Sequence, residues 1–318
     1  MTRIQVVAPD GAPEVRRGDD LVALLLPLVD LADGDVVVVT SKVVSKAEGR
    51  VVTGSRDDLL PSETVRVVAR RGPTTIVRTR LGLTMAAAGI DGSNVEVGSV
   101  VLLPDDPDAS ARTIRSRIRE RTGHNVGVIV TDTAGRAWRE GQTDIAIGAA
   151  GLLVAEDFAG RLDAHGNELE VTAPAVADEI AGVSELAQGK LGGRPFAVVR
   201  GRPDLVLPVG EDGPGARSLV RAEGGDLFGY GAREAVVRAL LGDPADRAPF
   251  GAPAPAQELA EVLRLVTGAE ARLDGGDLVV TSVRPDTVPA LAFAHGWAVG
   301  HSRSTDSPVE VRLQPGTP

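Results

Sequence analysis

Residues 34–50 read GDVVVVTSKVVSKAEGR and decide the fold of the first part of the chain. The four valines at 36–39 form a β-branched run, which predicts a strand buried on both faces. Before them, residues 19–32 carry leucines at helical spacing after an acidic start, so we expect a helix there. After them, the polar residues 40–50 follow the C-terminal end of the strand, the edge at which open α/β sheets bind ligands.

The same order of helix and strand recurs twice further along the chain. A charged helix is predicted over residues 109–122 and is followed by the apolar run NVGVIVT at 125–131. A second helix is predicted over residues 174–187, before the run PFAVV at 195–199. Strands that alternate with helices predict a mixed α/β protein, and we assign it to the α+β class.

A proline-rich stretch separates the end of the chain from this body. LGDPADRAPFGAPAPAQ, at 241–257, is typical of a semi-rigid linker. We therefore predict a main domain at 1–243, a linker at 244–256 and a small α+β module at 257–318. The module contains a helical pattern and then the strand pattern DLVVTSV, but no residues with evident chemistry.

Composition narrows the classes of function. The 318 residues include no cysteine, which excludes disulfides, thiolate metal sites and a cysteine nucleophile. A formal net charge of −10 argues against nucleic acid or an anionic membrane as a partner. The N-terminus has no signal-peptide pattern, and the longest apolar stretch, LVALLLPLVDLA, is too short to span a bilayer. We expect a cytoplasmic protein.

Two polar clusters are candidates for ligand binding. The first follows the valine run, where Ser41, Lys42 and Lys46 offer hydroxyl and ammonium groups suited to phosphate. Its plainer interpretation is a polar turn with surface lysines. The second is GIDGSN, in which Asp91 and Asn94 can place oxygen ligands for a hard cation such as Mg²⁺ on one loop. The commoner alternative there is an Asx turn.

A third cluster carries the strongest signal. VGVIVTDTAGRAWREGQTDIAIG, at 126–148, ends an apolar strand on Asp132 and Thr133, a natural pair of metal ligands. We expect a loop to follow, in which Arg136 and Arg139 could clamp phosphate or carboxylate oxygens. Asp144 could equally be structural. The number of polar groups directly after a core strand favours a functional site here.

Several ordered stretches together resemble one known family, the coenzyme F420-0:L-glutamate ligases, also called γ-glutamyl ligases. The resemblance runs from about Arg3 to Leu240. Its most specific stretches are GDDL, GDVVVVTSKVVSKAEGR, AGIDGSNVEVGSV, VIVTDTAGRAWREGQTDIAIG, VADEIA and AVVRG. Long matches in a fixed order are more specific than any short motif alone.

The resemblance implies GTP, two divalent cations (Mg²⁺ or Mn²⁺), a potassium ion and an intertwined homodimer. It implies one divalent ion on Asp91 and Asp132 and a second on Thr133, with Asp132, Arg136 and Arg139 in catalysis. Nucleotide contacts are implied for two segments and four single residues: Gly11, Ala12, Pro13 and Glu14; Gln188, Gly189 and Lys190; and Ser41, Lys42, Lys46 and Asn94.

This chain departs from the family pattern at two lysines. Lys42 stands where many relatives have threonine, and Lys190 stands where many have an acidic or amide metal ligand. An ammonium group cannot ligate a cation. Either Lys190 contacts phosphate or the second metal site is lost, and the sequence leaves both open.

The implied reaction activates the carboxylate of F420-0 as an acyl phosphate, with GTP as phosphate donor, and L-glutamate then displaces the phosphate. Further γ-linked glutamates could follow. Two other functions stay open at this point. One is a metal-dependent phosphatase or nucleotidase that uses Asp91 and Asp132, and the other is a non-catalytic nucleotide-binding partner.

Overall fold

In the computed structural model, the valine run forms strand β2 (Val36–Thr40) at the centre of a five-stranded sheet. The strand order is β1-β10-β2-β8-β9, in which β2 runs parallel to β8 (Gly127–Arg136) and antiparallel to β10 (Phe196–Arg200). Alternate valines of β2 belong to two different hydrophobic cores, one on each face of the sheet. The prediction of a doubly buried strand is confirmed, as is the α+β class.

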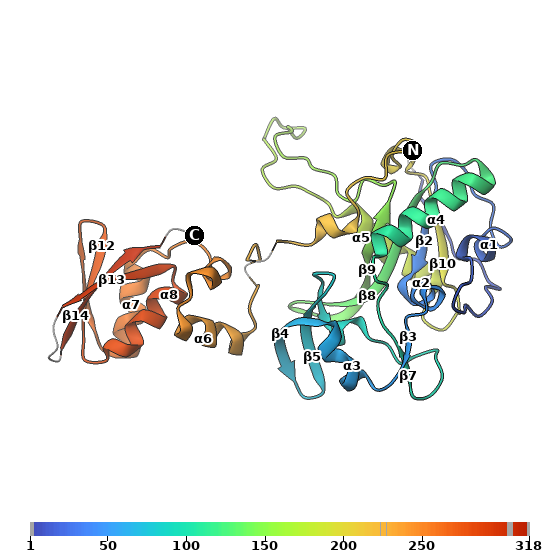
Figure 1. Ribbon diagram of the computed structural model, residues 1–318. Helices are drawn as coiled ribbons and strands as arrows, with labels where there is room; N and C mark the ends of the chain where they lie inside the picture. The colour runs from blue at the N-terminus through green and yellow to red at the C-terminus, as the bar shows by residue number, and fades with distance from the viewer. Residues whose placement is uncertain (1–2, 223, 227, 304–307, 317–318) are drawn as a thin grey trace. The chain divides into compact units, whose positions relative to one another are not determined.

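Helices cover both faces of this sheet (Figure 1). The first core also contains side chains of α4 (Pro107–Thr122) and α1 (Leu21–Leu25), and the second contains α5 (Val176–Gln188). The helix predicted over residues 19–32 is wrong in extent, since α1 has only five residues. Asp20 caps its start, and Pro27, which has no N–H to donate, follows just after its end.

The loop expected after Asp132 is a β-hairpin. β8 continues to Arg136, and β9 (Arg139–Ala150) returns antiparallel beside it. Trp138 adopts a left-handed backbone conformation, φ 61°, in the two-residue turn between these strands. The loop prediction was wrong because β8 and β9 stay paired beyond the apolar core, which keeps the polar residues 132–136 in the strand.

A second layer of short strands packs around a smaller core formed by Val77, Ala88, Ile90, Val100 and Leu102. Its sheets have the orders β3-β7 and β4-β5-β6. The remaining elements up to residue 220 are β1 (Gln5–Val7), α2 (Ser41–Glu48), β3 (Val51–Thr53), α3 (Arg56–Glu63), β4 (Thr64–Arg71), β5 (Thr74–Thr79), β6 (Thr84–Ala86), η1 (Ala87–Gly89), β7 (Ser99–Val101), η2 (Pro203–Leu205) and η3 (Ala216–Leu219).

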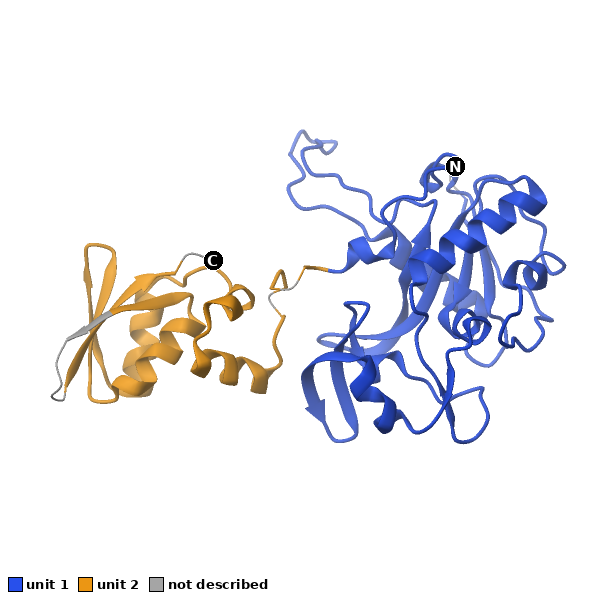
Figure 2. Cartoon of the chain, in the orientation of Figure 1, with its two compact units in different colours: residues 1–220 blue, residues 221–318 orange. Residues whose placement is uncertain are grey.

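The chain divides into two compact units, Met1–Val220 and Arg221–Pro318 (Figure 2). The structure describes residues 3–222, 224–226, 228–303 and 308–316. The boundary lies before the predicted linker, which folds into two 3₁₀ turns within the second unit. In that stretch the N–H of Ala254 donates to the carbonyl of His295, and the indole of Trp297 donates to the carbonyl of Ala254.

The second unit is an antiparallel sheet of order β11-β12-β14-β13 with a core of its own. Leu259, Leu263 and Val288 from two of its helices pack with Leu278 and Leu313 from its central strands. Its elements are α6 (Ala232–Leu241), η4 (Pro244–Asp246), η5 (Ala248–Phe250), α7 (Ala256–Thr267), β11 (Glu270–Asp274), β12 (Asp277–Ser282), η6 (Pro285–Thr287), α8 (Val288–Ala294), β13 (Trp297–Arg303) and β14 (Val309–Pro315).

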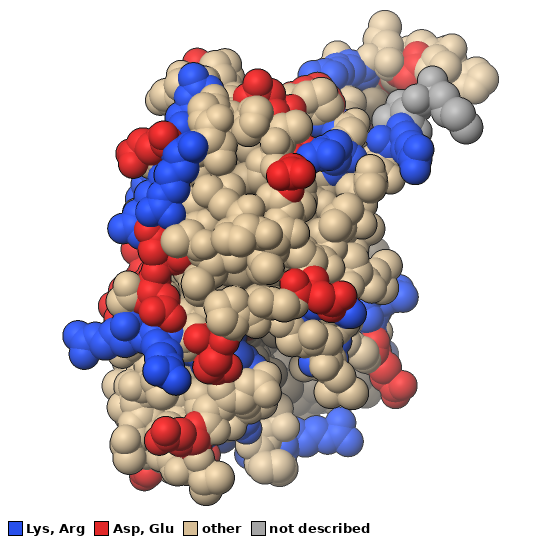
Figure 3. Space-filling view, turned by 90° about the vertical axis from the view of Figure 1, so that its right-hand side faces the viewer, with Lys and Arg blue, Asp and Glu red and all other residues tan. Residues whose placement is uncertain are grey.

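The surface on the α1 side of Figure 1 mixes charges of both signs around an uncharged centre (Figure 3). Along α4, three exposed arginines meet acidic partners: Arg112 pairs with Asp106, and Arg117 and Arg121 pair with Asp20. Through the described part of the chain, no helix has the length and apolar character needed to cross a membrane.

Candidate functional site

The candidate site lies where β2 ends beside the middle of β8. Because the two strands are parallel and Thr40 is in register with Thr131, the residues that follow them meet. Ser41 is the first residue of α2, and its hydroxyl donates to Oδ1 of Asp132 at 2.8 Å. Residues 91 positions apart in the sequence are thus joined by the register of one strand pair.

A small cavity of about 20 Å³ opens at this junction. Asp91 and Asp132 both line it, together with Ser41, Lys42 and Ser45. Within the described residues, the buried Oγ of Ser45 has no hydrogen-bond partner. A buried hydroxyl without a partner costs free energy, so it is a natural contact for a ligand in this cavity.

Asp132 is the most perturbed acid of the site. Burial raises the pKa of its carboxyl to about 7, against the lowering effect of the Ser41 hydrogen bond. The neighbouring carboxylates Asp144 and Asp91 raise that pKa further. A strongly raised pKa beside other acids marks a place where a cation would be favoured.

Asp91 is held by its own loop and by Lys42. The N–H of Ser93 donates to Oδ1 of Asp91 at 2.8 Å, which is the Asx turn considered from the sequence. Nζ of Lys42 lies 2.6 Å from Oδ2 of Asp91 and donates to Oγ of Ser93. Burial tends to raise the pKa of Asp91, but the bonds from Lys42 and Ser93 outweigh it and hold that pKa below its usual value.

A second group of oxygens surrounds Lys190. Its Nζ donates to Oγ1 of Thr133 at 2.7 Å and lies 3.0 Å from Oε1 of Glu185 and 3.8 Å from Oδ1 of Asp144. The Thr133 hydroxyl in turn donates to Asp144 at 2.7 Å. Asp144, which the sequence left as possibly structural, therefore belongs to this group. Glu185 was missed, since nothing in the α5 sequence sets it apart from other surface acids.

The predicted nucleotide segments are linked by ion pairs. Lys46 is buried, not exposed as its sequence context suggested, and its ammonium pairs with Glu14. Asp10, next to this segment, accepts from Nε of Arg194 at 2.7 Å. The side-chain amide of Gln188 donates to the carbonyl of Arg194, which closes the second segment on itself. Residues 10–14 and 188–194 thus lie together beside α2.

Other predicted residues lie apart from these contacts. Arg136 and Arg139 are exposed at the hairpin turn, and Arg136 donates to the carbonyl of Glu140. Arg136 is four residues beyond Asp132, or roughly 13 Å along an extended strand. Asn94 is exposed with φ 56°. Their roles stay predictions, as do those of Gly11, Ala12, Pro13 and Gly189.

The chemistry of the donors fits one divalent ion better than two. Asp91 and Asp132 face one cavity and repel each other, so a cation between them would be stabilised, and it would share Asp91 with the ammonium of Lys42 or displace that group. At Thr133 the ammonium of Lys190 already sits among the oxygens, and a divalent ion does not fit there unless the lysine leaves. In the described residues, no three acidic or histidine side chains are grouped to hold a metal. Water and substrate oxygens would therefore complete the coordination.

The fold is α+β, and the site gathers carboxylates, hydroxyls and lysines where β2 ends beside β8. The sequence model of the F420-0:gamma-glutamyl ligase family matches residues 11–63 and 58–201. The chain belongs to this family.

Coenzyme F420:L-glutamate ligases from three organisms are similar to this chain over most of their own length. The coenzyme F420:L-glutamate ligase of Archaeoglobus fulgidus is 43% identical over 221 residues, which are 63% of this chain and 88% of the relative. That of Methanopyrus kandleri is 39% identical over 240 residues, 68% and 93% of the two chains. That of Haloarcula marismortui is 40% identical over 223 residues, which are 62% of this chain and 87% of the relative. The family match lies wholly within the first unit.

Proposed function

We propose that this protein is a GTP-dependent ligase that joins L-glutamate to coenzyme F420-0 through an amide bond, in the biosynthesis of coenzyme F420. The observation that carries the proposal is the facing pair Asp91 and Asp132 at the start of α2, in a chain of the F420-0:gamma-glutamyl ligase family. The same site could act again on the γ-carboxylate of an attached glutamate.

The start of α2 suits the nucleotide phosphates. Thr40 makes no side-chain capping bond to the first turn of the helix, so the N–H groups there can point to an anion. Lys42 and Lys46 add positive charge on the same helix. Charged phosphates held by fixed donors need little reorganisation during the reaction.

The proposed reaction has two displacement steps. In the first, a carboxylate oxygen of F420-0 bonds to the γ-phosphorus of GTP, and the bond to the β-phosphate oxygen breaks so that GDP leaves with the electron pair. In the second, the glutamate nitrogen bonds to the acyl carbon, and phosphate leaves with the electron pair of the broken C–O bond. The nitrogen loses its surplus protons. The protein positions the reactants and offsets their negative charge.

Asp91 and Asp132 would hold one divalent ion, Mg²⁺ or Mn²⁺, which supplies charge neutralisation to the phosphates. Lys190 would supply the second positive charge beside Thr133. A potassium ion and a homodimer stay predictions of the resemblance. Residues 155–174 extend from the first unit (Figure 1) with Leu162 and Val171 exposed, two apolar side chains that a second copy could cover.

The test is a ligation assay with the purified full chain, F420-0, L-glutamate, GTP and Mg²⁺ or Mn²⁺, with products identified by mass and phosphate measured in parallel. We expect one phosphate for each glutamate attached, and far less product with ATP in place of GTP. Phosphate release that does not depend on glutamate would indicate the phosphatase or nucleotidase instead. GTP binding without turnover would indicate the non-catalytic partner.

A further inference from the structure

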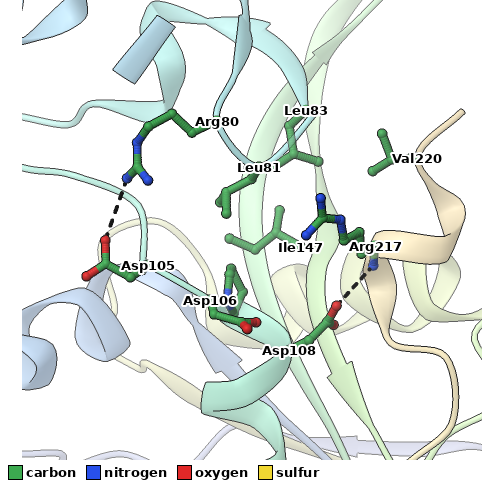
Figure 4. A pocket seen from close by; sticks show the side chains of 10 residues that line it. Arg80, Leu81, Leu83, Asp105, Asp106, Asp108, Ile147, Arg217 and Val220 are labelled. Atoms are coloured by element: carbon green, nitrogen blue, oxygen red, sulfur yellow. Dashed lines mark hydrogen bonds and ion pairs between the residues drawn. The ribbon is translucent and has the colours of Figure 1, made fainter. Parts of the chain in front are cut away.

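A second and larger cavity, of about 140 Å³, lies in the first unit. Its apolar wall is formed by Leu81 and Leu83 from the turn between β5 and β6, Ile147 of β9, and Val220 (Figure 4). On the same measure one water needs about 10–15 Å³, so the cavity can hold a molecule of roughly ten non-hydrogen atoms.

Charged side chains of both signs surround the apolar wall. Arg80 and Arg217 enter from opposite sides (Figure 4). Arg80 already has partners, since its guanidinium donates twice to Glu63 and lies 3.6 Å from Asp105. Arg217, on η3, is exposed, and among the described residues its guanidinium has no hydrogen-bond or ion-pair partner. A free guanidinium beside a cavity is the group best suited to bind a carboxylate with two hydrogen bonds.

The opposite charge is also available in this cavity. Asp105 and Asp106 line it with side chains that are 68% and 62% exposed. Asp105 pairs with Arg50 and Arg80, and Asp106 caps α4 and lies near Arg112, so a ligand ammonium would share these carboxylates with their present partners. Asp108 is different. It is buried, and its Oδ1 accepts from the N–H groups of Ala149 and Ala216, so its place is structural. As far as the described residues show, the lining therefore offers one guanidinium without a partner, two exposed carboxylates that already have partners, and an apolar wall.

This larger cavity lies next to the small cavity at Asp132. Ile147 is two residues along β9 from Ile145, which pairs with Asp132, a spacing of about 7 Å. The segment after β7 also connects the two cavities, because Leu103 lines the small one and Asp105 the larger one. A ligand in the larger cavity would have one end close to the carboxylate pair.

We propose that the larger cavity is the binding site for the incoming L-glutamate, which deepens the proposed function and rests on it. One glutamate carboxylate binds the guanidinium of Arg217. The ammonium group is held by Asp105 and Asp106 until it is deprotonated for attack. The methylene groups lie against Leu83 and Ile147. An amino acid with a carboxylate side chain carries both signs of charge around a short apolar stem, and it therefore matches this lining.

The experiment measures binding of radiolabelled L-glutamate to the full chain by equilibrium dialysis, with Mg²⁺ and a non-hydrolysable GTP analogue present. Arg217→Ala is expected to weaken binding about 10- to 100-fold, the loss of one charge-assisted pair. Arg217→Lys should recover part of it, and Arg70→Ala, an exposed arginine on β4, should bind as the natural chain does. Circular dichroism checks that each variant is folded.

Equal glutamate binding by folded Arg217→Ala and the natural chain would overturn the proposal, as would the absence of binding to the natural chain. The ligation assay separates this failure from that of the ligase function. An unchanged Michaelis constant for glutamate in Arg217→Ala would sink the glutamate site and leave the ligase standing. Binding that requires Arg217, without any ligation product, would support the site and refute the ligase.

Discussion

The two units of the molecule bury different kinds of side chains. The first unit buries the charged residues Asp35, Lys46, Asp108, Arg115 and Asp144. In the described part of the second unit, the buried polar residues are Thr267 and Ser282, and both make local bonds, to Leu263 and Arg284. Burying a charge costs free energy unless the charge is paired. The first unit therefore contains buried charges that the stability of the fold alone does not require.

The buried charges of the first unit fall into two groups. Arg115 donates to six oxygens, including the carbonyls of Val126 and Leu207, and Asp35 pairs with Arg200. These two residues link segments that are distant in the sequence, and their charged groups have hydrogen-bond partners within the protein. Around Asp132, in contrast, acids lie near one another and a buried hydroxyl lacks a partner. This difference separates structural charges from those kept for a ligand.

The largest expected effect is on catalysis. Asp132→Asn removes a charge that the proposed divalent ion would require, and we expect ligation to fall by about a thousandfold or more, since several kcal/mol of charge stabilisation would be lost. Asp277→Asn, in the second unit, is the matched control and should retain full activity. The mass-based assay measures both. Full activity in a folded Asp132→Asn protein would remove Asp132 from the site.

The same substitution should make the protein more stable at high pH. Burial raises the pKa of Asp132 from 3.8 to about 7, so the folded state holds its proton more tightly and loses stability as pH rises between these values. Asparagine does not ionise. In metal-free buffer, the free energy of unfolding of Asp132→Asn should exceed that of the natural chain by roughly 2–4 kcal/mol at pH 8 and by little at pH 4. Urea unfolding measures this, and an equal difference at both pH values would contradict it.

Lys46→Met should weaken GTP binding about 10- to 100-fold, because it removes the ammonium and keeps the buried aliphatic stem. Stability should fall only modestly, since the partner carboxylate of Glu14 is 69% exposed and stays hydrated. Calorimetric titration with a GTP analogue measures the affinity, and Arg264→Ala in the second unit is the surface control. Unaltered affinity would place Lys46 outside the nucleotide site.

Lys190→Gln should change how many metal ions bind. The natural chain is expected to bind one Mn²⁺ per chain in the presence of the GTP analogue, because the Lys190 ammonium contacts the oxygens around Thr133. The variant replaces the ammonium with an amide oxygen donor and should bind two. Electron paramagnetic resonance counts free Mn²⁺ in such titrations. Two ions bound to the natural chain would show that Lys190 moves aside.

The sequence predicted the core of the first unit and the acids of the site because both follow from local patterns. Four adjacent valines predict a strand buried on both faces, and the polar residues after two apolar runs mark Ser41 and Asp132 as candidates. That the two meet follows only from the parallel register of β2 and β8. The burial of Lys46 could not be predicted, since Lys42 and Lys46 are equivalent by pattern and only packing distinguishes them. The unit boundary was missed because prolines mark turns as readily as linkers.

We expect the chemistry to belong to the first unit alone. The direct measurement compares residues 1–220 with the full chain in the ligation assay. The cut after residue 220 lies between two units that each have a core of their own. A cut after Pro253, inside the proline-rich stretch, would instead leave α6 without the rest of its unit. We expect the shortened, folded protein to attach glutamate at a rate within about twofold of the full chain, and its Asp132→Asn variant to be inactive. A shortened protein that is folded yet inactive would contradict the claim and make the second unit part of the catalytic machinery.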